Sequence, residues 1–407
     1  MNNSVEDLIE AHKDIAKEVY FDIENSSPVP RKVIEAMLPY YNRKAYGNPT
    51  LTHKPGWEAY ETILAASKIV ASYIGAKNPE EISFTPGETE ANNLAIHGTV
   101  LNKKGKGSKI VISEIEPLGV LHTCEMLEKF GYKTVKIPVD REGFIDLEQL
   151  KTAVDKNTVL VSMMSVNHEI GTIEPIKDAV GIVKDKNPEA VFHTDISDAY
   201  GKIPYSVKEI PVDLATMSSY KILGPRGIGA LYVREDVQLE KILEGQIGTQ
   251  KLWPGVENTP LIVGFTKASE LAFTNFEANV SHMRKLRGKL IEGLTTGIED
   301  TLINGPLSDK RAPDNANISF LKCEGEALTI ELSLKGVYVS SGSACTRRLL
   351  QPSHVLVAIG RKYEEAHGSI LMKVTRLHRD NDVEYALAAF QEAVERLRKV
   401  YGSMEEA

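Results

Sequence analysis

The sequence has little cysteine, no long apolar run and no excess of positive charge. Only three cysteines, Cys124, Cys323 and Cys345, occur among the 407 residues, and none lies in a CxxC pair. This argues against a disulfide framework or a zinc site built from thiolates, and it favours a reducing, cytoplasmic compartment. No apolar run approaches 18 residues, and the acidic N-terminal stretch lacks the apolar segment of a signal peptide. We therefore expect neither a membrane span nor secretion.

The charge balance is acidic, with 48 basic against 56 acidic side chains and a formal net charge of -8. Such a chain has no dominant basic face for a phosphate backbone, so direct nucleic-acid binding is not expected. Hydrophobic residues make up 42% of the chain, which is enough to bury a large core. No internal repeat or low-complexity segment is visible. The composition indicates a globular protein of roughly two or three domains.

Short β-branched runs alternate with helical patterns through the first two thirds of the chain. This alternation predicts an α/β fold with a mostly parallel sheet covered by helices on both faces. The segment 57–74 has apolar residues near helical spacing and is followed by Gly75, so we expect a core-facing helix that ends there. The predicted strands cover 109–113, 134–137, 158–163, 190–193, 214–217 and 229–233.

The pattern changes after about residue 260. Long charged helical segments, 277–294 and 381–401, flank short strand-like pieces at 317–321 and 336–339. We therefore predict three parts. Residues 1–20 form an N-terminal helix and arm, 21–260 form a large domain, and 261–407 form a smaller α+β domain that carries a loop around Cys345.

A strand, a glycine turn and a helix start follow one another in ISFTPGETEANNLAIHG, residues 82–98. The helix begins near Thr89, just after Pro86 and Gly87, and its free N–H groups suit a phosphate. Such junctions are more often purely structural. Glu88 within the turn also weighs against an anion, because its carboxylate repels one unless it points away.

Two further motifs place a carboxylate and a lysine after predicted strands. Asp195 ends an apolar strand in HTDISDAYG, where ligands bind in open α/β sheets, although an aspartate there can also cap a turn. Lys221 in MSSYKILGPRGIG has apolar neighbours, and a partly desolvated lysine has a free-base population that reacts with aldehydes. Most lysines are simply solvated.

The order of these motifs is more specific than any of them alone. The glycine turn is followed by Asn167 in SVNHEIG, then Asp195, then Lys221 shortly after Ser218. Pyridoxal phosphate requires a phosphate cradle, a carboxylate that keeps its ring nitrogen protonated, and a lysine for a Schiff base. All three occur in order within a suitable sheet, so we predict this cofactor.

Cys345 lies in a glycine- and serine-rich stretch, VSSGSACTRRLLQP, directly before two arginines. Adjacent positive charge stabilises a thiolate, which is the nucleophilic form of cysteine. A free cysteine is more often a small buried apolar side chain, and we interpret Cys124 and Cys323 in that way. Cys345 is the candidate nucleophile.

Together these motifs resemble the pyridoxal-phosphate-dependent cysteine desulfurases within the class V aminotransferase group. The resemblance implies the fold of these aminotransferases, with a large cofactor domain and a smaller C-terminal one. It also implies that Lys221 carries the cofactor, that Asp195 pairs with its ring nitrogen and that Asn167 lies at a cofactor oxygen. The matching stretches are YFDIENSSPVP, YGNPTLTH, TPGETEANNLAIHG, VNHEIGTIEPI, HTDISDAYGKI, SSYKILGPRGIGALYV, ENTPLIVGF, SSGSACTRRLLQPSHVL and AHGSI.

The same resemblance implies the reaction. The cysteine matching Cys345 attacks the sulfur of substrate L-cysteine, leaving a persulfide and releasing L-alanine, while the arginine matching Arg376 in KVTRLHRD holds the substrate carboxylate through a two-pronged ion pair. The family forms homodimers, and its members supply sulfur to an acceptor such as a cluster scaffold or a thiolation protein.

Several departures from the family pattern fall within the site. Pro117 stands where the family has a ring-stacking histidine, and Asp198 stands where it has a glutamine that donates to the cofactor's phenolic oxygen. Tyr220 replaces a phosphate-binding histidine, and Val256 replaces a threonine that reaches the phosphate across the dimer. The N-terminal DNAATTP-like element reads DIENSSP. We expect Thr89, Glu88, Ser218, Tyr220 and Asp198 to complete the cofactor site.

Loss of the stacking histidine removes an acid/base group worth roughly 10² to 10⁴ in rate. Either His122 or His168 takes over the proton transfer, or the chemistry differs. His168 directly follows Asn167 and is the preferred candidate, although a packing role is equally compatible with its position.

Three functions therefore remain. The leading hypothesis is a homodimeric cysteine desulfurase that supplies sulfur for iron–sulfur cluster assembly or for thiolation. The second is a related pyridoxal-phosphate lyase or transferase that acts on another sulfur or selenium amino acid or on a carrier-bound serine derivative, as Pro117, Asp198 and Val256 suggest. The third is a catalytically degenerate sulfur-relay paralogue, which the retention of Lys221, Asp195 and Cys345 disfavours.

Overall fold

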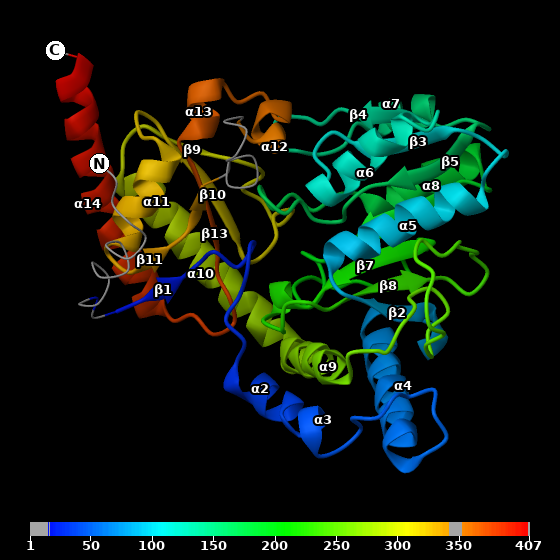
Figure 1. Cartoon of the computed structure of the whole chain (residues 1–407). Coiled ribbons are helices and arrows are strands. Elements are labelled where there is room, and N and C mark those ends of the chain that lie inside the picture. The colour runs from blue at the N-terminus through cyan, green and yellow to red at the C-terminus, as the bar shows by residue number, and fades with distance from the viewer. Residues whose placement is uncertain (1–14, 16, 342–351, 406–407) are drawn as a thin grey trace.

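The computed structural model describes residues 15, 17–341 and 352–405. It shows an α/β protein in which a seven-stranded sheet and a separate four-stranded sheet lie on opposite sides of the molecule (Figure 1). The four-stranded sheet belongs to the C-terminal part of the chain. The predicted fold class is confirmed.

The large sheet is mostly parallel. Only β8 runs antiparallel to its neighbours β2 and β7, and the pairs that join β7, β6, β5, β3 and β4 are all parallel. Its strands, in spatial order, are β2 (Ile82–Thr85), β8 (Gly229–Val233), β7 (Leu214–Ser218), β6 (Val191–Asp195), β5 (Thr158–Ser162), β3 (Lys109–Ser113) and β4 (Lys133–Ile137).

Helices cover both faces of this sheet, because its strands are apolar on both sides. Val191 packs on the face covered by α5 (Glu88–Asn102) and α6 (Leu118–Glu128), and the next residue, Phe192, packs on the opposite face. This alternation follows from the twofold period of a strand. The second face is covered by α2 (Arg31–Met37), α4 (Lys54–Ile74), α7 (Leu147–Ala153), α8 (Ile176–Lys186) and α9 (Thr259–Phe273).

Helix α4 confirms the core-facing helix that the sequence pattern predicts. It begins three residues earlier than expected, at Lys54, and ends at Gly75, which has a φ of 70°. The Gly75 N–H donates to the carbonyl oxygens of Ala71 and Ser72. Glycine adopts this left-handed conformation without the steric penalty of a side chain, so the helix stops here.

The second sheet is antiparallel and has its own apolar core. Its strands, in order, are β12 (Ser340–Ser341), β13 (Ser369–Lys373), β10 (Asn315–Phe320) and β9 (Thr301–Ile303). The core is shared with α10 (Phe276–Gly297), α11 (Gly325–Ser333) and α14 (Asp380–Glu405). Near the start of the chain, β1 (Val19–Tyr20) pairs with β11 (Val337–Tyr338). The domain boundaries at residues 20 and 260 stay predictions.

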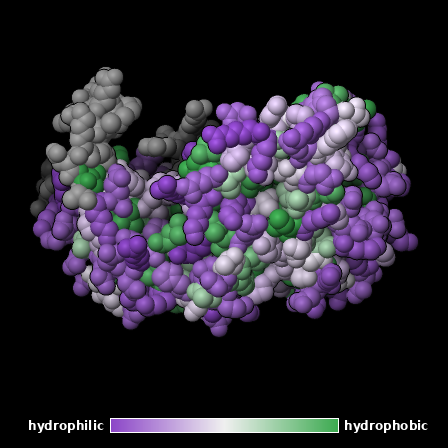
Figure 2. All heavy atoms as spheres, turned by 90° about the horizontal axis from the view of Figure 1, so that it is seen from below, coloured by the Kyte–Doolittle hydropathy of each residue, from purple (hydrophilic) through white to green (hydrophobic). Residues whose placement is uncertain are grey.

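Three short elements lie near the edges of the two units. They are α3 (Pro39–Asn42), α12 (His354–Ala358) and α13 (Tyr363–His367). Large apolar side chains on and between α2, α3 and α4 are exposed, including Leu38, Tyr41 and Trp57. The view from below shows apolar patches between hydrophilic side chains (Figure 2).

Within the described ranges, no helix is both long and apolar enough to cross a membrane.

The two-sided burial of the large sheet leads to a stability prediction. Phe192 is completely buried, so Phe192→Ala should lower the free energy of unfolding by about 3–5 kcal/mol through lost burial and a residual cavity. Phe130→Ala is the matched control because Phe130 is 70% exposed, and its effect should stay within about 0.5 kcal/mol. Denaturant unfolding measures both values, and equal effects would contradict the packing described.

Candidate active site

The predicted cofactor residues follow the carboxyl ends of neighbouring strands. Asp195 is the last residue of β6, and Ser218 is the last residue of β7. Lys221 follows in the short 3-10 helix η2 (Tyr220–Ile222). The ends of these strands meet at one edge of the sheet, which is where ligands bind in open α/β folds.

The amine of Lys221 lies close to three carboxyl groups. Its side chain is almost completely buried, and its Nζ lies 2.7 Å from Asp198, 3.0 Å from Glu24 and 3.2 Å from Glu88. Burial by itself lowers the pKa of a lysine, but here the charges of Asp198 and Glu24 outweigh burial and hold its pKa well above the ordinary value. Lys221 is therefore an ammonium group in this cage.

Asp198 is the centre of a larger buried charge network. Besides Lys221 it contacts Lys373 and, at 3.3 Å, Lys202, whose Nζ also lies 2.7 Å from Asp314. Burial raises the pKa of Asp198, but the three lysines overcome it and bring the pKa well below its usual range. Asp198 is therefore an ionised acceptor, in contrast to the donating glutamine of the family pattern.

Three members of this network, Glu24, Lys202 and Lys373, are absent from the residues that the motifs single out. Glu24 lies in the DIENSSP element, and Lys373 ends strand β13, which the apolar spacing did not identify. Lys202 lies four residues after Asp198 and forms an ion pair with it. The spacing between Asp198 and Lys202 can be recognised in the sequence. Glu24 and Lys373, in contrast, reach the site only through the tertiary structure.

Asp195 is held in a fixed orientation. One carboxylate oxygen accepts a hydrogen bond of 2.8 Å from Asn92 Nδ2, and the other accepts one of 2.8 Å from the backbone N–H of Ser197. Burial raises the pKa of Asp195, while the charge of Lys221 opposes this rise. The carboxyl group thus lies within electrostatic reach of the lysine, as the motif order predicts.

The start of α5 offers donors for a phosphate. Its N-cap, Gly87, provides no side-chain cap, and the hydroxyl of Ser218 is buried without a hydrogen-bond partner in the described part of the chain. Thr89 is exposed in the first turn of the helix. Free N–H groups at a helix N-terminus together with an unsatisfied hydroxyl suit an anion.

Glu88 does not oppose an anion at this point. Burial, together with the neighbouring Asp195 and Glu24, raises its pKa to about 8 against the attraction of Lys221. Near neutral pH the carboxyl group therefore keeps its proton and can donate a hydrogen bond. The sequence-based objection to Glu88 assumed an ionised side chain.

Tyr220 and Asn167 are both engaged within the protein. The Tyr220 hydroxyl donates to the backbone carbonyl of Glu24 at 2.9 Å. Asn167 Nδ2 donates to the carbonyl of Ile115, while its Oδ1 accepts from the backbone N–H of Ile170. These contacts fix the loops around the site, and the cofactor contacts of both side chains stay predictions.

The two candidate histidines lie in different surroundings. His122 is exposed on α6. His168 has a buried Nδ1 without a partner among the described residues, and it is close enough to Glu24 and Lys221 to interact with their charges. Burial lowers its pKa to about 4, so it is a neutral imidazole near pH 7. Of the two candidates, His168 is the one within electrostatic range of Lys221, and its role in proton transfer stays a prediction.

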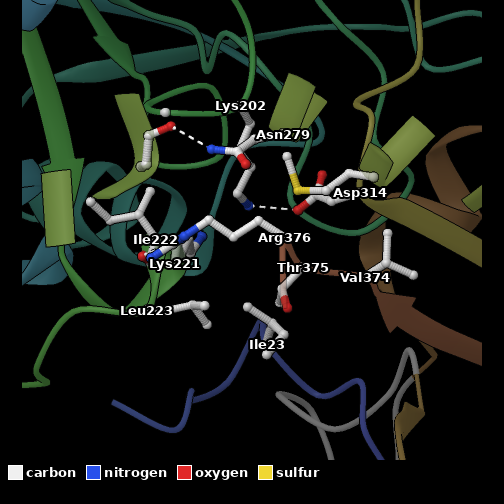
Figure 3. Close-up of a pocket in the computed structure, with 13 residues that line it drawn as sticks. Ile23, Lys202, Lys221, Ile222, Leu223, Asn279, Asp314, Val374, Thr375 and Arg376 are labelled. Carbon is white, nitrogen blue, oxygen red and sulfur yellow. Dashed lines mark hydrogen bonds and ion pairs between the residues drawn. The ribbon is translucent and has the colours of Figure 1, made fainter. Parts of the chain in front are cut away.

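Arg376 borders a small cavity beside Lys221 (Figure 3). The cavity has a volume of about 20 Å³, which is enough for a water molecule or one end of a small polar group. Nη1 of the Arg376 guanidinium group donates to the carbonyl of Ile222 at 3.2 Å, and Nη2 is buried without a partner in the described ranges. Burial lowers its pKa to about 10. The side chain is available for an incoming carboxylate.

The remaining site candidates are less informative. Pro117 directly precedes α6, and Val256 is 57% exposed. Cys345 lies outside the described residues. Cys124 and Cys323 are both buried, and burial raises the pKa of Cys124 to about 12, so their interpretation as apolar packing residues is confirmed.

Comparisons with known proteins identify the family. Residues 19–378 match the family "Aminotransferase class-V". The chain belongs to this family. It is 41% identical to the cysteine desulfurase IscS of Dictyoglomus turgidum over 384 residues, covering 94% of this chain and 96% of that protein. The resemblance to cysteine desulfurases within this family, drawn from the motifs, is confirmed.

Solved structures agree with this assignment. A NifS-like protein matches with a TM-score of 0.87 and 34% identity, covering 93% of this chain and all of the other. A structure described as SspA in complex with cysteine matches with a TM-score of 0.74 and 30% identity, covering 88% of this chain and 99% of the other.

The class is pyridoxal-phosphate-dependent, and the residues of this chain fit that group. The unsatisfied Ser218 hydroxyl and the uncapped α5 suit the phosphate. The fixed Asp195 suits a protonated ring nitrogen, and the amine of Lys221 suits the aldehyde of the cofactor. Glu88, which has a proton to donate near neutral pH, does not prevent the fit.

The raised pKa of Glu88 predicts how stability depends on pH without added cofactor. Between the ordinary value of 4.5 and about 8, folded Glu88 holds a proton that the unfolded chain has released, so its contribution to stability falls as the pH rises. Relative to the wild type, Glu88→Gln should therefore gain on the order of 1–3 kcal/mol in unfolding free energy between pH 5 and pH 8. Denaturant unfolding at several pH values measures this gain.

The control for this experiment is Glu90→Gln, which changes a carboxylate in the same helical turn. A wild-type profile and a Glu88→Gln profile that run parallel across this range would contradict a protonated Glu88.

Proposed function

We propose that this chain is a pyridoxal-phosphate-dependent cysteine desulfurase that converts L-cysteine to L-alanine and leaves a persulfide on Cys345. The proposal rests mainly on one observation: buried Lys221 and oriented Asp195 lie at the same edge of the large sheet. The chain is also 41% identical to a cysteine desulfurase. The structural relative solved in complex with cysteine supports the same substrate class.

Each side chain of the site has a distinct task in this proposal. Ser218 and the α5 N-terminus would hold the phosphate, Lys221 would bind the cofactor through its nitrogen, and Asp195 would pair with the ring nitrogen. When bound, the cofactor supplies an electron sink that makes the bonds at the substrate α-carbon easier to break. Lys221 then accepts and returns a proton at Nζ, and His168 is the neutral base at its side.

Arg376 binds the substrate carboxylate. Its buried Nη2 lacks a partner in the described structure and borders the cavity next to Lys221. A guanidinium group forms two parallel hydrogen bonds to a carboxylate, so it orients the amino acid as well as binding it. This places the substrate amine toward Lys221.

Cys345 is the sulfur acceptor in the reaction. The carbon–sulfur bond of the substrate breaks, a sulfur–sulfur bond to the Cys345 thiolate forms, and the remaining carbon skeleton leaves as alanine after protonation. The sequence places two arginines close to this cysteine, which favours the thiolate. The persulfide sulfur then passes to a scaffold for iron–sulfur clusters or to a thiolation protein.

We also propose a cytoplasmic homodimer. The exposed apolar side chains on and between α2, α3 and α4, among them Leu38 and Trp57, support contact with a second copy. The low cysteine content supports a reducing compartment. The sulfur-relay alternative has no use for the buried lysine, so the intact Lys221 favours an active enzyme.

The proposal predicts that cofactor-loaded protein converts L-cysteine to L-alanine and gains one sulfur atom on the Cys345 peptide. Cys345→Ser should abolish both products, because the sulfur then has no acceptor. Amino-acid analysis measures alanine, and peptide mass spectrometry measures the persulfide. Cys323→Ser is the matched control and should retain both. Absence of both products from loaded wild-type protein would defeat the proposal.

The charge of Asp198 supports a second candidate specificity. An ionised carboxylate accepts hydrogen bonds, whereas the glutamine of the family pattern donates one to the cofactor. The same assay should therefore include other sulfur and selenium amino acids and a carrier-bound serine derivative. Turnover of one of these far above L-cysteine would favour the alternative, a lyase or transferase of different specificity.

The role of Arg376 predicts a binding defect. Arg376→Gln should raise the KM for L-cysteine by about 10- to 200-fold, because it removes a charge-assisted hydrogen bond worth roughly 1.5–3 kcal/mol. Arg379→Gln is the control, since Arg379 is exposed and its backbone N–H, not its side chain, bonds to Asp382. Steady-state kinetics measure KM, and an unchanged KM in Arg376→Gln would remove Arg376 from the substrate site.

A further inference from the structure

Two buried groups beside Lys221, Glu24 and Lys373, have no task in the proposed reaction. Glu24 lies in the segment between β1 and α2, and Lys373 is the last residue of β13. The side chains are 13% and 1% exposed. They come from opposite ends of the chain, yet both reach the amine of Lys221 or its partners.

These groups form a bridged arrangement. One Glu24 oxygen lies 3.0 Å from Lys221 Nζ, and the other contacts Lys373 Nζ. Lys373 also contacts Asp198, whose second oxygen lies 2.7 Å from Lys221. Glu24 and Asp198 are thus each shared by the same two lysines.

Among the described groups that these ion pairs join, the charges balance only while Lys221 is protonated. With Glu88 in its neutral form, the ionised carboxylates Glu24, Asp198 and Asp314 face the ammonium groups of Lys202, Lys221 and Lys373. Asp195 lies outside these ion pairs, and its oxygens accept hydrogen bonds from Asn92 and from the Ser197 N–H. Among the described residues, the charged and titratable groups that act on Lys221 from the surrounding elements are Glu24, Glu88, His168, Asp195, Asp198, Tyr220 and Lys373, with Lys202 and Asp314 one contact further out.

Lys221 must lose its proton before its nitrogen can bond to an aldehyde carbon. At that moment Glu24 and Asp198 lose one of their shared cations. Asp198 still has Lys202 and Lys373, whereas Glu24 retains only Lys373 as an ion-pair partner in the described structure. A buried carboxylate without a cationic partner is unfavourable. Lys373 makes deprotonation of Lys221 less costly, because it stays paired with Glu24 and Asp198. Glu24 makes the same deprotonation more costly, because its negative charge stabilises the ammonium form of Lys221.

We propose that Glu24 and Lys373 are a compensating pair of positioning residues that controls how readily Lys221 releases its proton. Lys373 favours the neutral amine, and Glu24 favours the ammonium form. The inference rests on the proposed role of Lys221 as the reacting amine, but it concerns the charge of that amine and not the identity of the amino-acid substrate.

The test measures the amine directly with formaldehyde and cyanoborohydride. Neutral Lys221 bonds to the formaldehyde carbon, water leaves, and hydride from cyanoborohydride reduces the product to a stable methylated lysine. Mass spectrometry of the Lys221 peptide gives the labelling rate at each pH, with exposed Lys32 as internal reference. This probe requires neither bound pyridoxal phosphate nor turnover.

The two single variants should shift the labelling in opposite directions. Lys373→Met removes a cation, so the pH at half-maximal labelling should rise by about one unit, equivalent to about tenfold slower labelling at fixed pH. Glu24→Gln removes an anion, so the midpoint should fall by a similar amount. The double variant, which keeps the network neutral, should return close to the wild-type midpoint.

Three further variants separate charge from packing. Lys373→Arg keeps the charge, so it should label like the wild type and should also fold if Lys373→Met does not. Lys335→Met and Glu392→Gln remove members of an exposed ion pair and should leave the midpoint unchanged. Shifts in the same direction for Lys373→Met and Glu24→Gln, or a double variant that adds rather than cancels, would overturn the inference.

The outcome is separable from that of the proposed function. Opposite, cancelling shifts support the compensating pair even in a protein that yields no alanine. A protein that yields alanine and persulfide while the midpoint stays fixed in both single variants retains the proposed function and loses this inference. Lower stability of Lys373→Met without a midpoint shift would likewise assign Lys373 a purely structural role.

Discussion

The structure of the site depends on how a buried lysine is neutralised. Lys221 is nearly inaccessible to water, and an isolated ammonium group would be unstable there. Three carboxyl groups, from Glu24, Glu88 and Asp198, surround its nitrogen. Near pH 7 the balancing charges come from Glu24 in the N-terminal segment and Asp198 in the turn after β6, so neutralising one amine requires the correct assembly of distant parts of the chain.

The same requirement links the two sheets. Lys373 ends β13 in the antiparallel sheet, but its ion-pair partners lie beside the parallel sheet and in the segment after β1. A buried ion pair contributes little net stability on average, whereas breaking one is expensive because a charge is left unpaired. The network therefore specifies the relative placement of these segments more than it adds to the free energy of folding.

Much of the fold and part of the site could be predicted because the relevant signals are local. The predicted strands 109–113 and 229–233 match β3 and β8, since short, largely apolar runs indicate burial on both faces. Asp195 and Lys221 come within a few residues of such runs. Glu24 and Lys373 gave no comparable signal, because their role depends on long-range contacts. Glu24 contacts Lys221 about 200 residues away in the sequence, and Lys373 contacts Asp198 at a separation of 175 residues.

Protonation states are the other part that the sequence could not provide. In the sequence, Glu88 is an anion next to a phosphate-binding turn, and His168 is a base with an ordinary pKa. In the folded chain burial moves them in opposite directions, to about 8 and about 4, so both are neutral near pH 7. The charged species at the amine are then Glu24, Asp198 and the lysines. Because a neutral imidazole of low pKa is a weak base, proton transfer at this site relies on the balance of those charges more than on a single histidine.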